Sequence, residues 1–132
     1  MTYSVDAESI TCGDFDLDGN IDLVSNGSFL QGEGNGSFVV TTTLDLRADD
    51  IKAADFNNDG KLDLAKVLHG NTYALRIYFG NGDGTFQESV GYEGAMYPLS
   101  LAIADIDGDG IVDIIVPDSG KTYIYLGSGD GT

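Results

Sequence analysis

The chain has 132 residues, and six Lys and Arg stand against 22 Asp and Glu, which gives a formal charge of −16. This acidity argues against nucleic acid and anionic membrane surfaces as partners, because both require a basic face. With 42% apolar residues and no apolar run near the ~20 residues of a membrane span, the composition predicts a folded domain without membrane insertion. A single cysteine excludes an internal disulfide framework and a Cys-rich zinc site.

Three acidic segments of nine residues share the pattern D-φ-[DN]-x-D-G-x-φ-D, where φ is apolar. They contain eleven of the 18 Asp residues, as four, three and four. Alternating or apolar residues precede each segment, and β-branched residues follow it, so both flanks are predicted to be strands. The segments span 14–22, 55–63 and 105–113, and the preceding strands are predicted at 9–12, 50–53 and 100–103.

Carboxylates at positions 1, 3, 5 and 9 of such a loop would repel one another, so a hard divalent cation with oxygen ligands is expected to neutralise them. A backbone carbonyl at position 7 would add a ligand, and Gly at position 6 permits the bend. An EF-hand is excluded because position 12 holds Ser25, Lys66 and Val116 instead of Glu, and because the flanks are strands. The alternative is a set of solvated acidic turns.

A second motif, G-x-G-[ND]-G-[ST], recurs at 32–37, 80–85 and 127–132, each time after an aromatic-rich strand. Phosphate binding would require a helix after the glycines, but a strand follows, so the motif is interpreted as a hairpin turn. The first Asp of the acidic segments recurs at intervals of 41 and 50 residues. Four-stranded units of this period are typical of propeller blades.

The paired motifs resemble the FG-GAP/VCBS repeats of integrin-α-like β-propellers, in three copies that cover essentially the whole chain. The resemblance implies an all-β fold with three four-stranded antiparallel blades, at about 9–47, 48–97 and 98–132, in a single propeller segment over 1–132. It implies one Ca²⁺ per blade, three per chain, in the loop between the first two strands. The implied ligands are the side chains of Asp14, Asp16, Asp18, Asp22, Asp55, Asn57, Asp59, Asp63, Asp105, Asp107, Asp109 and Asp113, and the carbonyls of Asn20, Lys61 and Ile111. The neutral Asn57 predicts that the second site is the weakest.

The N-terminal segment 2–8 resembles the outer strands that follow the first two Gly-rich turns. Joining Thr132 to Met1 would complete a regular repeat, as in a propeller closed by a strand from the other end of the chain. Three blades are too few for a ring. The hypothesis is a head-to-tail homodimer with six blades, in which each N-terminal strand completes a blade of the partner. The alternative is a piece of a longer propeller.

Catalysis has little support. The only histidine, His69, lies in a predicted turn, and Cys12 occupies a position held by Ala53 and Ile103 in the other repeats, which predicts a small core residue. The chain is therefore expected to be a calcium-binding interaction or structural module and not an enzyme, in an extracellular setting where calcium is abundant. Alternatives are a glycan-binding lectin-like or cell-adhesion propeller, and an accessory propeller of a polysaccharide-degrading enzyme. Candidates for a glycan or protein surface are Tyr73, Tyr92, Tyr97 and Tyr123.

Overall fold

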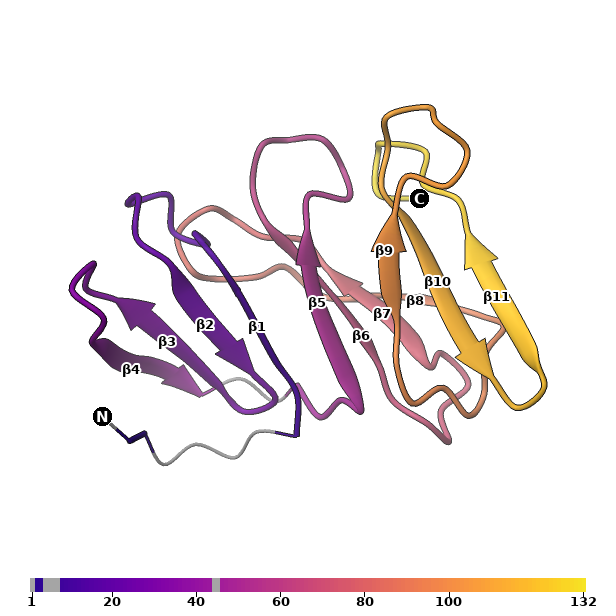
Figure 1. Cartoon of the computed structure of the whole chain (residues 1–132), viewed down its shortest axis with the longest axis horizontal. Helices are drawn as coiled ribbons and strands as arrows, with labels where there is room; N and C mark the ends of the chain where they lie inside the picture. Colours follow the sequence, from indigo (N-terminus) through magenta and orange to yellow (C-terminus); the bar gives the residue numbers. More distant parts are fainter. Residues whose placement is uncertain (1, 4–7, 44–45) are drawn as a thin grey trace.

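The computed structural model describes residues 2–3, 8–43 and 46–132 and contains 11 strands in three antiparallel sheets. The sheets stand side by side, the first at the left and the third at the right of Figure 1. Neighbouring strands in each sheet are consecutive in the chain. The predicted all-β fold with propeller-like blades is confirmed, although the sheets do not close into a ring.

The first sheet contains β1 (Ile10–Gly13), β2 (Asp22–Ser25), β3 (Ser28–Gly32) and β4 (Phe38–Thr43). The second contains β5 (Asp50–Ala54), β6 (Asp63–Val67), β7 (Leu75–Tyr78) and β8 (Val90–Tyr92). The third contains β9 (Ala102–Ala104), β10 (Asp113–Asp118) and β11 (Lys121–Tyr125).

The third sheet has three strands where the sequence predicts four. Residues 4–7 of the predicted N-terminal strand lie outside the described residues. Tyr3 lies beside the first sheet, where the Phe38 amide donates a hydrogen bond to the Tyr3 hydroxyl (2.9 Å) and the two rings meet edge to face. Within the described residues, no helix has the length and apolar character of a membrane span.

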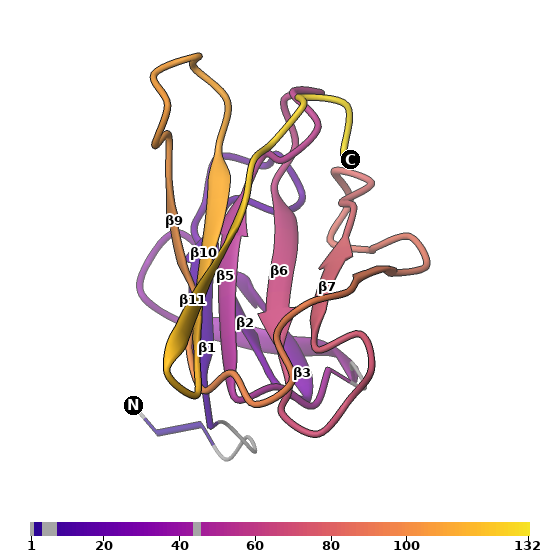
Figure 2. The same cartoon turned by 90° about the vertical axis from the view of Figure 1, so that its right-hand side faces the viewer.

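The second sheet is covered on both faces, and every residue of β6 is buried. Figure 2 looks along the stack from the third sheet. One apolar cluster fills the space between the first and second sheets, around Phe15, Phe29 and Leu64. Another, around Phe56, Ile77 and Ile114, fills the space between the second and third sheets. Burial on both faces explains why the central strands are nearly continuous apolar runs.

The outer face of the first sheet has no such cover. Cys12 on β1 is exposed, so its interpretation as a core residue is wrong for the single chain. Its counterpart in the second sheet, Ala53, packs against the cluster between the first two sheets. The difference arises because a preceding sheet covers β5, whereas none among the described residues covers β1.

Asp50 connects the three sheets at the start of β5. Its Oδ1 accepts hydrogen bonds from the Ser9 hydroxyl (2.9 Å) and Lys52 Nζ (2.7 Å), and its Oδ2 accepts one from the Leu101 amide (3.0 Å). Burial works against ionisation of this carboxyl, but the hydrogen bonds from Lys52, Leu101 and Ser9 outweigh burial and hold the pKa of Asp50 below its ordinary value. The ionised carboxylate therefore stabilises the stack of sheets.

Replacing Asp50 with Asn should lower the free energy of unfolding at pH 7 by about 1–3 kcal/mol, because an amide nitrogen would face a hydrogen-bond donor. A carboxyl with a depressed pKa contributes stability above its unfolded pKa and loses it as the pH falls through the folded pKa. The difference between wild type and Asp50→Asn should therefore shrink below about pH 4. Urea unfolding between pH 7 and 3 measures it, with Glu88→Gln as an exposed control. A difference that is independent of pH would contradict this assignment.

Candidate metal centre

The three acidic segments form the connections β1–β2, β5–β6 and β9–β10, and all three lie at the same end of the sheets, at the top of Figure 1. Each connection joins the first two strands of its sheet, as the sequence predicts. The candidate ligands of the three segments therefore form three separate groups, one on each sheet.

Similar hydrogen bonds to the side chains at positions 1 and 5 of each loop organise the three loops. In the first, the carboxylate of Asp14 accepts bonds from the amides of Asp18 (3.1 Å) and Gly19 (3.0 Å). In the second, Asp55 accepts bonds from the amides of Asp59 (3.2 Å) and Gly60 (2.8 Å). The side chain at position 5 then accepts a bond from the amide at position 7, which curls the loop around its acidic side chains. In the third loop Asp105 accepts bonds from the amides of Gly110 (3.0 Å) and of Gly108 (2.7 Å), so one donor lies one position earlier than in the other loops, and Ile111 N donates to Asp109 (2.8 Å).

The backbone at position 4 of each loop is left-handed. The φ angles are +59° at Leu17, +55° at Asn58 and +82° at Gly108. Leucine rarely adopts this conformation, which costs an L residue roughly 1–2 kcal/mol. The first loop keeps it nevertheless, because the hydrogen bonds around Asp14 require the same path as in the other two loops.

Carboxylates converge in two of the loops. Oxygen atoms of Asp14, Asp16 and Asp18 lie within 4.8 Å of one another, and those of Asp105, Asp107 and Asp109 do the same. No described residue gives either group a cationic partner. In the second loop Asn57 leaves two carboxylates, and Lys61 Nζ pairs with Asp59 at 3.3 Å. The first and third loops therefore carry more negative charge than the second, and no lysine of the described residues offsets it.

The Asp at position 9 has a different setting. Asp22, Asp63 and Asp113 are buried, and none belongs to the groups within 4.8 Å. Both oxygens of each accept a backbone hydrogen bond, one from position 2 of the same loop and one from the first glycine of the Gly-rich turn. The donors are Phe15 and Gly32 to Asp22 (3.0 and 2.9 Å), Phe56 and Gly80 to Asp63 (2.9 and 2.8 Å), and Ile106 and Gly127 to Asp113 (2.8 and 2.9 Å).

Burial raises the pKa of Asp22 and of Asp63 above the ordinary value, and it outweighs the two backbone donors that favour the ionised form of each. The other acidic residues of the same loop add to the effect, Asp16 and Asp18 for Asp22. A cation in the loop would oppose this repulsion. The side chain at position 9 thus joins the loop to the turn, and repulsion from the other carboxylates of the loop contributes to its raised pKa.

The first glycine of the turn is a functional residue that the sequence interpretation missed. A Cβ atom on Gly32 would lie 2.1 Å from the Ile21 carbonyl oxygen, and one on Gly80 would lie 2.2 Å from the Leu62 carbonyl oxygen. Gly127 is in the same position beside Val112, at 2.6 Å. Glycine is required here for close approach of two backbones, and its φ is not left-handed. The signal was present, since this glycine recurs in all three repeats.

Replacing Asp63 with Asn should lower the free energy of unfolding by about 1–3 kcal/mol even in EDTA, because the amide nitrogen would face the amide of Phe56 or Gly80. Asp59→Asn is the matched control: it removes the same charge from the same loop at an exposed position, and we expect a change within about 0.5 kcal/mol. Urea unfolding of both variants in EDTA measures the difference. Equal effects would contradict a structural role for position 9.

Comparison with known proteins agrees with this geometry. Residues 55–116 match the family model described as FG-GAP-like repeat. The matched segment begins at position 1 of the second loop and ends in β10, so it contains the second and third loops and the turn between them. A search of curated proteins finds no match to the chain. The resemblance inferred from the motifs is thus confirmed for residues 55–116, which match an FG-GAP-like repeat.

Proposed function

We propose that the chain is a calcium-binding β-propeller module whose folded state is stabilised by ions in the three loops. The observation that carries the proposal is the convergence of three carboxylates in the first loop and three in the third, to which the described residues contribute no cationic partner. Clustered carboxylates destabilise a fold unless a positive charge joins them. Carboxylate and carbonyl oxygens are the ligands that calcium prefers.

The proposed ligands are the side chains at positions 1, 3, 5 and 9 and the carbonyl at position 7. Although both oxygens of the ninth Asp already accept a hydrogen bond, each carboxylate oxygen has a second lone pair for a cation. We expect the second site to be the weakest, because Asn57 is neutral and Lys61 already pairs with Asp59. Three ions would change the formal charge from −16 to −10.

The exposure of equivalent residues supports a head-to-tail assembly. Ile51, the second residue of β5, and Leu101, just before β9, are buried in the clusters shared with the preceding sheet, whereas the equivalent Ile10 is 51% exposed. On the opposite face, Phe29 and Ile77 are buried against the following sheet, whereas the equivalent Ile124 is 56% exposed. The two end faces therefore carry the two halves of one repeated contact.

A hydrogen bond between sheets repeats in the same way. The Ile51 amide donates to Ser9 Oγ of the first sheet (3.2 Å), and the Leu101 amide donates to Asp50 Oδ2 of the second (3.0 Å). The next bond in the series would join the Ile10 amide of one chain to Ser100 of another. We infer that two chains use these faces to form a six-bladed ring.

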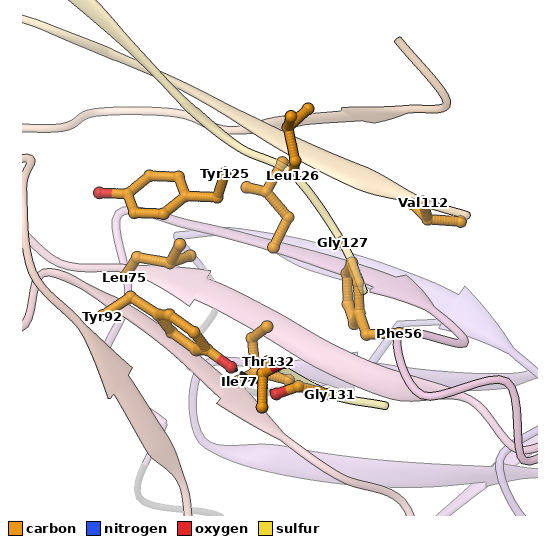
Figure 3. Close-up of a pocket in the computed structure, with 11 residues that line it drawn as sticks. Phe56, Leu75, Ile77, Tyr92, Val112, Tyr125, Leu126, Gly127, Gly131 and Thr132 are labelled. Carbon is orange, nitrogen blue, oxygen red and sulfur yellow. Dashed lines mark hydrogen bonds between the residues drawn. The ribbon is translucent and has the colours of Figure 1, made fainter. Parts of the chain in front are cut away.

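A cavity between the second and third sheets supports completion by a further strand. Phe86 packs edge to face on Phe15 between the first two sheets, with 5.8 Å between the ring centroids. The equivalent place beside Phe56 is a cavity of about 130 Å³, with Ile77 and Thr132 at its wall (Figure 3). The N-terminal segment 2–8 of a second chain, in the register of the strands after the other Gly-rich turns, would cover this cavity.

Removing calcium should destabilise the chain, since an ion that binds only the folded state adds about 2.7 kcal/mol per site at a hundredfold excess over its Kd. Native mass spectrometry should detect three ions per wild-type chain and two after the double substitution Asp105→Asn and Asp107→Asn. The double substitution Glu88→Gln and Glu93→Gln removes the same charge from exposed positions and should keep three. No thermal stabilisation by calcium over magnesium would contradict the proposal.

The assembly should be a dimer in calcium at micromolar concentration by analytical ultracentrifugation. Ile124→Lys should shift it to the monomer, because a charge would enter the proposed contact. Tyr97→Lys, at a similarly exposed position in the connection between β8 and β9, should leave the dimer intact. A calcium-loaded wild-type monomer would overturn the ring and favour closure by further repeats of a longer protein.

A further inference from the structure

Half of the basic residues of this acidic chain meet at one hollow. Arg47, Lys66 and Arg76 are three of the six Lys and Arg residues, and they line a cavity of about 240 Å³ together with Asn71 and Tyr73. These residues belong to the second sheet, to the β6–β7 connection and to the segment before β5. The β6–β7 connection lies at the end of the second sheet opposite the acidic loops (Figure 1). The hollow is thus separate from the candidate metal centres and from both end faces.

Lys66 is buried in the wall of the hollow, and no carboxylate of the described residues forms an ion pair with it. The side chain is 6% exposed, its Nζ donates a hydrogen bond to the Arg47 carbonyl (2.9 Å), and it lies over the Tyr78 ring at 5.4 Å. An ammonium has three donors, so this arrangement uses only part of its capacity. A buried charge is costly unless an opposite charge joins it. Lys66 is therefore placed to receive an anion.

Within the described part of the chain, neither arginine pairs with a carboxylate. Arg76 Nη1 donates to Ser89 Oγ (3.1 Å), and its guanidinium lies over the Tyr73 ring at 5.9 Å. Among the described residues, the Lys and Arg side chains in ion pairs are Lys52 with Asp50 and Lys61 with Asp59. Arg47, Lys66 and Arg76 are thus outside the ion pairs of the described residues, in a chain with 22 acidic residues.

We propose that this hollow binds the carboxylate or sulfate group of an acidic saccharide. Guanidinium and ammonium groups form strong charge-assisted hydrogen bonds with both oxyanions. The exposed Tyr73 ring and Asn71 amide at the rim suit a sugar, because an aromatic ring packs against its C–H face and an amide pairs with its hydroxyls. The negative field of the rest of the chain disfavours long polyanions, so a ligand of a few sugar rings is the expected size.

Isothermal titration calorimetry tests the proposal with a glucuronate trisaccharide, the neutral glucose trisaccharide of the same linkage, and a sulfated counterpart. The two acidic saccharides distinguish a carboxylate from a sulfate as the preferred group, and the neutral one should not bind. Binding should persist in EDTA, because no lining residue belongs to the metal loops. Loss in EDTA from a chain that circular dichroism shows to remain folded, or equal binding of the neutral saccharide, would overturn the proposal and leave the calcium proposal standing.

Arg76→Gln should weaken binding about tenfold, since it removes one charge-assisted contact. Lys121→Gln on β11 removes the same charge from a residue that does not line the hollow and should leave the affinity unchanged. Lys66→Met should abolish binding, and if that variant does not fold, Arg76→Gln carries the test alone.

An equal loss of affinity with Lys121→Gln would indicate unspecific electrostatic attraction. Tighter binding of a tetraglutamate peptide would assign the hollow to acidic peptides. Either result would overturn the saccharide assignment.

Discussion

The carboxylate at position 9 of each acidic loop is the interaction on which the rest of the structure depends. Asp63 is buried, and its two oxygens join the start of the loop at Phe56 to the start of the Gly-rich turn at Gly80. These two segments are far apart in the chain, and no strand pairing connects them at that point. The glycine lets the turn pass against the Leu62 carbonyl, so that its amide reaches the carboxylate. The loop, the turn and the strands between them are thereby fixed as one unit.

Because this unit repeats, the contacts between sheets repeat as well. Ser9 accepts a hydrogen bond from Ile51 in β5, and Asp50 accepts one from Leu101 just before β9. Apolar residues at matching positions fill the space between the sheets. A repeat that buries one face against its neighbour must leave complementary faces at the two ends of the stack. The exposure of Ile10 and Ile124 is the direct consequence, and it is the structural basis for the proposed ring.

Charge is divided between the two ends of the sheets. The acidic loops gather at one end, where the carboxylates of Asp14, Asp16 and Asp18 converge. The hollow with Arg47, Lys66 and Arg76 includes the β6–β7 connection at the opposite end. Three neighbouring cations that form no ion pair with the described carboxylates produce a local positive field within a negative surface. The proposed calcium sites and the proposed anion site therefore act on ligands of opposite charge at opposite ends.

Much of the fold follows from local patterns. The acidic segments, their glycines and the β-branched residues beside them specify loops and strands through interactions within a few residues, so the all-β fold and the position of each loop were predictable. Other features depend on residues that are distant in the sequence. The pairing of Asp63 with Gly80, the exposure of Cys12 and the meeting of Arg47 with Lys66 arise only when strands and sheets pack together. The sequence by itself determined the repeat and its candidate ligands, because these lie within single loops. Only the tertiary structure decided which sheet faces are covered and which charged side chains lie near one another, because both depend on contacts between residues of different strands and sheets.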